Sequence, residues 1–311
     1  MALFSTQDII VGDLKLHTES FGRASNPAIL LVSGAMAPAR FWTDEFCQQL
    51  ANAGYFVIRY DHRDMGLSSP VDYAQHPYSL NDLTEDAVAI LDAYNIEKAH
   101  IIGHSMGGAI AQLLSLDYSS RVASLSLISS AVLTNARLNQ QEQDQLNVTW
   151  KTLDACNKPT KKFGESVDGF LKSYEYLHGD IPIDKNIATA YIRDMYERSK
   201  PEHIAWFEKF SAGTDPLHNH VKAQQHIVDR TQDLKKITVP VVIIHGEKDC
   251  LSFPRIMQEY CARLIPHTRM RIIPGMGHMI LNRALFVEIA DHVLEKLNEA
   301  EGNKDDKQRN Y

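Results

Sequence analysis

The chain has 311 residues, of which 44% are hydrophobic and 23% charged, and its net charge is -7. At roughly 150 residues per domain, this length predicts one large domain, alone or with a smaller insert. The balance of 32 Lys and Arg against 39 Asp and Glu, without a dense basic run, argues against a nucleic-acid partner. The apolar runs are shorter than the ~18 residues that a membrane helix needs, and residues 1–11 lack a signal-peptide pattern. We therefore expect a cytoplasmic protein with no membrane partner.

The four cysteines, at positions 47, 156, 250 and 261, are scattered without C-x-x-C pairs. This spacing predicts neither a disulfide framework nor a zinc site. His218, His220 and His226 lie near one another, but no cysteine or carboxylate pattern accompanies them. We expect these histidines to be solvated residues of a helix or loop rather than metal ligands.

Strand and helix signals alternate along the first 132 residues. Short apolar runs bounded by glycines or turns predict buried strands over 28–33, 55–60, 98–103 and 122–129. Apolar residues at helical spacing predict helices over 41–53, 79–94 and 106–118. Ser79 and Asp82 resemble a capping box at the start of the second helix. This alternation favours an α/β fold with a mostly parallel central sheet flanked by helices.

The strand signals vanish between residues 133 and 236, where apolar residues recur at helical spacing. We expect a helical insert there, carried by a core domain of residues 1–132 and 237–298. Within the second part of that core, the predicted strands are 239–244 and 269–273, and the predicted helices are 253–264 and 284–297. The polar, charged tail of residues 299–311 is expected to be disordered.

A predicted strand, the segment Gly103-His104-Ser105-Met106-Gly107 and a predicted helix follow one another directly. In such a G-x-S-x-G arrangement the serine sits on a sharp strand-to-helix turn, which exposes its hydroxyl at the carboxyl end of the sheet. The flanking glycines are needed because a side chain in this strained turn would collide with neighbouring backbone. The helix that follows directs its free N–H groups at the reacting centre. Ser105 is therefore the candidate nucleophile.

A serine hydroxyl is a poor nucleophile at neutral pH and requires a base that is itself oriented by an acid. Asp249 closes the strand-turn segment 241–249, and His278 follows the next predicted strand in a glycine-rich loop. Both residues lie past strand carboxyl ends, the same edge as Ser105, and the chain order Ser, Asp, His is the order this architecture uses. We expect these three residues to be catalytic, with Glu247 as an alternative acid.

Several segments of the chain resemble the α/β-hydrolase family over roughly residues 12–298. They are Leu30–Ala35, Tyr60–Ser68, the serine turn and the segments around Asp249 and His278. The resemblance implies the α/β-hydrolase fold, with residues 133–236 forming a helical cap over the active site. Within the family, the chain is most similar to bacterial methylesterases of the aclacinomycin methylesterase type.

The chain departs from the family's patterns at two positions. Ser33 stands where a histidine commonly precedes Gly34, and the residue after that glycine lends its backbone N–H to the oxyanion hole in the family. The resemblance therefore implies that the oxyanion donors are the backbone amides of Ala35 and Met106. Asp64 replaces a glycine in the family's D-x-R-G-x-G-x-S turn, whose Asp61 and Arg63 we expect to fix loops beneath the site by charge-assisted hydrogen bonds.

A serine at position 105 favours acyl transfer and disfavours the family's dehalogenases and epoxide hydrolases, which attack with a carboxylate. We expect a serine carboxylester hydrolase that acts on a small to medium, partly apolar small-molecule ester, with a methyl ester as one candidate. No cofactor or metal is required for this chemistry. Two alternatives stay open, namely a carbon–carbon bond hydrolase that uses the same residues and a non-catalytic receptor for a small molecule. The sequence also leaves the choice between monomer and homodimer open.

Overall fold

The computed structural model describes residues 4–156, 163–201, 218–225 and 228–308. Its centre is an eight-stranded sheet in the order β1-β2-β4-β3-β5-β6-β7-β8. The strands are β1 (Phe4–Val11), β2 (Leu14–Phe21), β3 (Ala28–Val32), β4 (Phe56–Tyr60), β5 (Ala99–His104), β6 (Val122–Ile128), β7 (Val241–Gly246) and β8 (Thr268–Ile273). Neighbouring strands are parallel from β4 to β8 in this order, whereas β2 is antiparallel to both β1 and β4. The expected mostly parallel sheet is confirmed.

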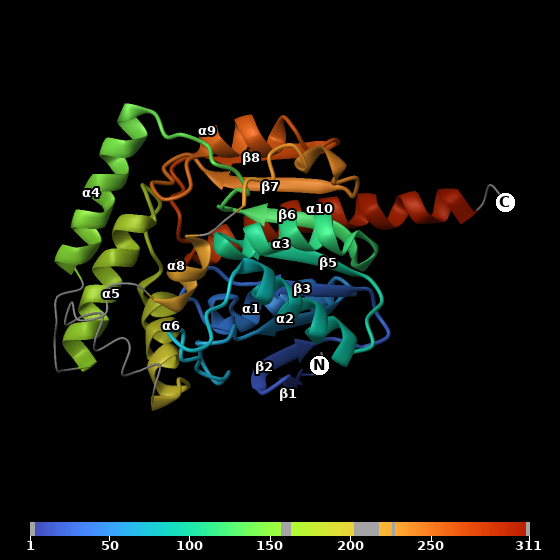
Figure 1. Ribbon diagram of the computed structural model, residues 1–311, viewed down its shortest axis with the longest axis horizontal. Helices are drawn as coiled ribbons and strands as arrows, with labels where there is room; N and C mark the ends of the chain where they lie inside the picture. Colours follow the sequence, from blue (N-terminus) through green and yellow to red (C-terminus); the bar gives the residue numbers. More distant parts are fainter. Residues whose placement is uncertain (1–3, 157–162, 202–217, 226–227, 309–311) are drawn as a thin grey trace.

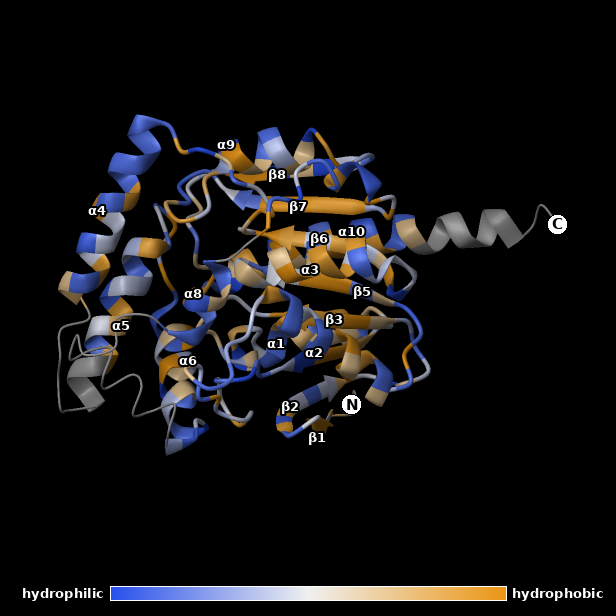
Figure 2. Ribbon diagram, viewed as in Figure 1, coloured by the Kyte–Doolittle hydropathy of each residue, from blue (hydrophilic) through white to orange (hydrophobic). Residues whose placement is uncertain are grey.

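Helices cover both faces of the sheet (Figure 1). They are α1 (Asp44–Asn52), α2 (Leu80–Ala93), α3 (Met106–Asp117), α9 (Pro254–Ile256) and α10 (Arg283–Gln308). Side chains alternate between the faces of a strand, so Leu30 and Val32 of β3 pack with α2 and α3, whereas Ile29 and Leu31 pack with α1 and α10. Both faces are apolar, as Figure 2 shows for the central strands, because parallel strands are buried on two sides.

The structure differs from the expected elements in three places. The N-terminal hairpin of β1 and β2 was not predicted, because β1 is an edge strand whose residues are mostly exposed and follow no apolar pattern. The helix expected at 253–264 divides into α9 and a π-helical segment, Met257–Ala262. Helix α10 continues past residue 298, where the polar tail was expected to begin. Glu299 pairs with Lys296 and Arg269, and Ala300 is buried.

The insert between β6 and β7 lies beyond the carboxyl ends of the parallel strands (Figure 1). Its described elements are α4 (Gln140–Cys156), α5 (Phe163–Leu177), α6 (Lys185–Glu197), α8 (Asn219–Gln224) and the 3₁₀ helix Leu234–Lys236. Asp184 begins α6 by accepting the backbone N–H groups of Asn186 and Ile187. The helices of the insert therefore stand at the edge of the sheet where the serine turn lies.

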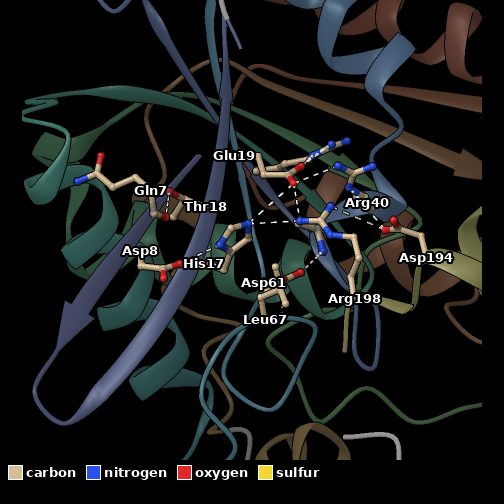
Figure 3. A network of polar contacts seen from close by, with 12 residues as sticks. Gln7, Asp8, His17, Thr18, Glu19, Arg40, Asp61, Leu67, Asp194 and Arg198 are labelled. Carbon is tan, nitrogen blue, oxygen red and sulfur yellow. Dashed lines mark hydrogen bonds and ion pairs between the residues drawn. The ribbon is translucent and has the colours of Figure 1, made fainter. Parts of the chain in front are cut away.

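A buried charge cluster fastens α6 to the core (Figure 3). Glu19 of β2, which is 1% exposed, accepts hydrogen bonds from Arg40 at 3.3 Å, Arg59 at 2.8 Å and Arg198 at 2.7 Å. Burial raises the pKa of Glu19, but the hydrogen bond with His17 and the charges of the arginines outweigh it and bring this pKa to about 2. Glu19 is therefore ionised and holds the end of α6 against β2.

Candidate active site

Ser105 lies on the sharp turn between β5 and α3. Its backbone adopts φ 52° and ψ -120°, a conformation that non-glycine residues rarely take and that costs free energy. A Cβ atom at Gly103 would collide with the backbone of Gly107, and one at Gly107 would collide with the carbonyl of Val32. The glycines are therefore required because three backbone segments meet around the serine.

Ser105, His278 and Asp249 form a continuous hydrogen-bonded chain. The Nε2 atom of His278 is 3.1 Å from Oγ of Ser105, and its Nδ1 atom is 3.1 Å and 3.0 Å from the two carboxylate oxygens of Asp249. Asp249 Oδ1 also accepts the backbone N–H groups of Leu251 and Ser252, at 2.9 Å and 2.8 Å, which fixes the carboxylate. The structure thus brings together three residues from distant parts of the sequence.

The carboxylate of Asp249 is buried and ionised. Burial raises its pKa, but the electrostatic interaction and the hydrogen bond with His278 outweigh burial and leave the pKa below its usual value. His245 Nε2 lies 3.4 Å from the second carboxylate oxygen, and His104 Nε2 donates to the backbone carbonyl of His278 at 2.9 Å. Two buried histidines therefore support the acid and the loop of His278.

Glu247, the alternative acid, points elsewhere. Its side chain is exposed, and its carboxylate accepts the backbone N–H of Gly275 at 3.1 Å. No hydrogen bond between Glu247 and His278 is found in the described part of the chain. The geometry favours Asp249 over Glu247 as the partner of His278.

The candidate oxyanion donors belong to two segments, the start of α3 and the loop that follows β3. Met106 is the first residue of α3 and is fully buried, and its N–H is among those that a helix N-terminus leaves without an intrahelical acceptor. Gly34 packs directly against the turn, since a Cβ atom there would stand 3.1 Å from Cβ of Ser105. Ala35 follows Gly34 in the chain and is the candidate donor on this loop. This arrangement suits stabilisation of a negative oxygen at the reacting carbon.

The comparison with known proteins agrees with this architecture. A family model described as the alpha/beta hydrolase fold matches residues 27–282. The chain belongs to the alpha/beta hydrolase family. The fold resembles that of the meta-cleavage product hydrolase CumD from Pseudomonas fluorescens IP01, with a TM-score of 0.72 at 21% identity, over 94% of this chain and 98% of that one.

Two relatives similar over most of this alpha/beta hydrolase are rhodomycin D methylesterases. DauP from Streptomyces sp. (strain C5) is 32% identical over 291 residues, which are 88% of this chain and 92% of that protein. DnrP from Streptomyces peucetius is 30% identical over the same shares of the two chains. The expected resemblance to bacterial methylesterases is confirmed. None of the helices described is long and apolar enough to cross a membrane.

The segment 61–68 of this alpha/beta hydrolase is hydrogen-bonded to the loop after β3 (residues 33–39, the oxyanion loop), which carries the candidate donor Ala35. Asp61 accepts the backbone N–H groups of Ala39 and Leu67, at 2.7 Å and 2.9 Å, and Arg63 makes two hydrogen bonds to Asp86, at 2.8 Å and 2.7 Å. The supporting role expected for Asp61 and Arg63 is thus seen as hydrogen bonds. His62 also contributes through a hydrogen bond to the carbonyl of Ser33 at 3.1 Å, which the sequence did not reveal.

Asp64, one of the departures from the family pattern, has a structural reason. Its φ of 68° is the left-handed conformation that the usual glycine adopts without strain, and aspartate tolerates it better than most residues. In return its carboxylate accepts hydrogen bonds from Val71 N at 2.6 Å, the hydroxyl of Tyr78 at 2.6 Å and Nδ2 of Asn219 at 3.0 Å. The aspartate at this position therefore links the core to α8 of the insert.

The insert also holds the loop of His278 by backbone hydrogen bonds. The carbonyl of Leu177, at the end of α5, accepts the N–H groups of His278 and Met279 at 2.7 Å and 3.0 Å. The carbonyl of His178 accepts the N–H of Gly277 at 2.8 Å. Backbone contacts between segments about a hundred residues apart leave no sequence pattern, so these residues were not predicted.

The expectation that His218 and His220 are solvated is wrong. His218 is 4% exposed and His220 is fully buried, because the short helix α8 is inserted between the oxyanion loop and the segment 61–68. His226 lies outside the described residues. Among the described residues, no group of three or more histidine, cysteine, aspartate or glutamate side chains has a metal-binding arrangement.

Proposed function

We propose that this alpha/beta hydrolase is a serine carboxylester hydrolase. The observation that carries the proposal is the hydrogen-bonded chain of Ser105, His278 and Asp249 at the carboxyl edge of the sheet. Such a chain is the arrangement by which a serine hydroxyl becomes a nucleophile at neutral pH. The methylesterase relatives support an ester as the bond that is cleaved.

In this mechanism, Oγ of Ser105 attacks the ester carbonyl carbon while Nε2 of His278 accepts the hydroxyl proton. The ionised Asp249 holds the Nδ1–H of His278 and stabilises the imidazolium that forms. His278 then donates its proton to the leaving alcohol, which gives an acyl-enzyme. Water attacks this ester with His278 as the base, releases the acid and restores Ser105.

The backbone amides of Ala35 and Met106 stabilise the negative oxygen of both tetrahedral intermediates. Their N–H groups belong to the fixed backbone of the oxyanion loop and of α3, so they need no reorganisation when the charge develops. Loss of one such donor typically costs about 3 kcal/mol of transition-state stabilisation. The proposed chemistry uses no cofactor and no metal.

We propose a small to medium, partly apolar ester as the substrate, with a methyl ester as the first candidate because the two relatives are methylesterases. The core of residues 1–132 and 237–298 carries the three catalytic groups. The insert of residues 133–236 is proposed to act as the cap, since its helices stand beyond the strand ends where Ser105 lies (Figure 1).

The test compares the wild-type protein with Ser105→Ala on p-nitrophenyl esters of increasing acyl length and on a panel of methyl esters. Hydrolysis that disappears in the variant supports the proposal, and its dependence on acyl length gives the size of the acyl pocket. A diketone-like ring-fission product is tested under the same conditions, because the alternative hydrolase would cleave a carbon–carbon bond in such a compound. Cleavage of that compound without cleavage of any ester would contradict the proposal and favour the carbon–carbon bond hydrolase.

A further inference from the structure

We propose that His220, a residue of the insert, is a positioning residue for the oxyanion hole. This inference rests on the proposed function, and it assigns to the insert a part in catalysis beyond covering the site. It starts from the place of the imidazole ring, which is fully buried between two loops of the core. One loop carries Ala35, the proposed oxyanion donor, and the other is the segment 61–68.

The two ring nitrogens of His220 bind these loops in different ways. Nε2 lies 2.7 Å from the backbone carbonyl of Arg63, and Nδ1 lies 3.1 Å from the backbone nitrogen of Met36. A carbonyl oxygen only accepts and a backbone N–H only donates, so Nε2 carries the hydrogen and Nδ1 accepts. Both contacts are therefore satisfied by one neutral tautomer of the imidazole, which joins the two loops.

The Met36 amide belongs to a strained residue of the oxyanion loop. Met36 has a φ of 59°, in the left-handed region that favours glycine, and it lies in a turn closed by the hydrogen bond from Ala37 N to Gly34 O at 3.3 Å. A methionine held in this conformation is strained, and such strain persists only when surrounding contacts enforce it. The hydrogen bond to His220 is a contact of that kind, and Ala35 belongs to the same turn.

The ring of His220 is itself held in place. It packs edge-on against His62 and His218, with ring centroids 5.5 Å and 4.5 Å away. His62 donates to the carbonyl of Ser33 in the same oxyanion loop, and the neighbouring Asn219 donates to Asp64. Asn219 attaches α8 to the core through hydrogen bonds of its own, whereas His220 contacts the oxyanion loop directly through Nδ1.

The experiment compares two amide substitutions at this position. In His220→Asn the carboxamide oxygen lies near the place of Nδ1 and can still accept the Met36 N–H. In His220→Gln the longer carboxamide lies near Nε2, so the contact with Arg63 is kept and the contact with Met36 is lost. Asn219→Ala is the control, because it removes contacts of the same helix to Asp64 and Val71 without touching the oxyanion loop.

Each variant is measured for kcat and KM on a p-nitrophenyl ester, for thermal unfolding, and for the rate at which a fluorophosphonate labels Ser105. Labelling forms the Oγ–P bond, expels fluoride and passes the hydroxyl proton to His278, so it reports the serine centre without needing ester turnover.

We expect His220→Gln to lose ~10-fold or more in kcat with KM little changed, since oxyanion stabilisation acts in the transition state. His220→Asn should keep most of kcat, and Asn219→Ala should lower the melting temperature without this loss.

Equal kcat values for the Asn and Gln variants, whether both reduced or both normal, would overturn the role of Nδ1. If kcat falls in proportion to the melting temperature in all three variants, His220 acts only through packing and the proposed positioning role is wrong. If the wild-type protein is labelled but cleaves no ester, the proposed function is wrong. The role of His220 is then tested by the labelling rates alone, which should be lower for His220→Gln than for His220→Asn. A wild-type protein that is neither active nor labelled would overturn both.

Discussion

The backbone N–H of His278 donates to the carbonyl oxygen of Leu177 at 2.7 Å, so the proposed catalytic base is bound directly to the last residue of α5. An isolated bridge between Gly179 and Met276 continues this contact along the loop. The insert therefore touches both halves of the proposed centre, with Leu177 on the side of the base and His220 on the side of the oxyanion loop. A cap that moved as one rigid lid would disturb both.

Substitution of Gly179 by alanine tests the contact of the insert with the loop of His278. A Cβ atom there would lie 2.5 Å from the carbonyl oxygen of Gly275 and 2.8 Å from the nitrogen of Gly277, and the residue has a φ of 75°. We expect the loop to shift and kcat to fall by ~10-fold or more, because small displacements of catalytic groups are costly. Ester hydrolysis and thermal unfolding are measured together.

Gly12→Ala is the matched control for Gly179→Ala. Gly12 has a φ of 58° in the turn between β1 and β2, and nothing stands within 4 Å of an added Cβ atom. This substitution should cost roughly 1 kcal/mol of stability from backbone strain and leave kcat unchanged. A Gly179→Ala protein with normal kcat would show that the loop of His278 does not depend on this contact.

Asp249→Asn should reduce kcat by about four orders of magnitude with little change in the melting temperature. The asparagine keeps the size of the side chain but removes the charge that stabilises the imidazolium and favours the other tautomer of His278. Steady-state hydrolysis of a p-nitrophenyl ester measures the loss. Glu247→Gln is the control and should keep wild-type kcat, whereas a large loss there would make Glu247 the acid.

Glu19→Gln should destabilise the fold by about 3–5 kcal/mol at pH 7, because it leaves the arginines around a buried position without their carboxylate. Urea unfolding at pH 7 measures this free energy. The comparison variant is Glu45→Gln, whose exposed partner Arg283 lies 3.8 Å away and whose loss should cost less than about 1 kcal/mol. Similar small losses in both variants would mean that the charge cluster does not hold α6.

Asp194→Asn should show a pH-dependent effect on stability. Burial raises the pKa of Asp194 from 3.8 to about 6, although the charge of Arg40 lowers it in part. Between these two values the folded protein binds a proton that the unfolded chain has lost, so the wild-type protein loses stability relative to the variant as pH rises through 6. The two proteins should have equal melting temperatures near pH 4, and the variant should be more stable by about 1 kcal/mol at pH 7, allowing for solvent screening.

The exposed Glu197 on the same helix provides the control for Asp194, as Glu197→Gln removes a carboxylate from α6 without a buried environment. The change in stability difference between pH 4 and pH 7 should be larger for Asp194→Asn than for this exposed variant. A difference between the wild type and Asp194→Asn that is constant over this range would contradict the raised pKa.

Local sequence patterns were sufficient for the sheet and for the position of the serine. The run Ala28–Val32 is apolar without alternation because both faces of β3 are buried, and this is visible in the sequence. The capping box of Ser79 and Asp82 at the start of α2 is likewise local and was predicted correctly. The glycines around Ser105 are required by the steric limits of a single tight turn, so they too are recognisable from the sequence.

The supporting residues depended on the tertiary structure. His62, Leu177 and His220 have no pattern of their own, since each acts through a hydrogen bond to backbone brought close only by folding. Histidines spaced as in 218–220 fit a solvated loop as well as a buried helix, and only the docking of α8 distinguishes the two.

Local patterns along the chain were thus enough to predict the parallel sheet, the serine turn and the order of Ser105, Asp249 and His278, because strand burial and turn sterics are local properties. The tertiary structure decided how the insert is fastened to the core and which groups hold the loops of His278 and Ala35. Those contacts join segments far apart in the chain, and their free energy depends on distances that a one-dimensional pattern does not contain.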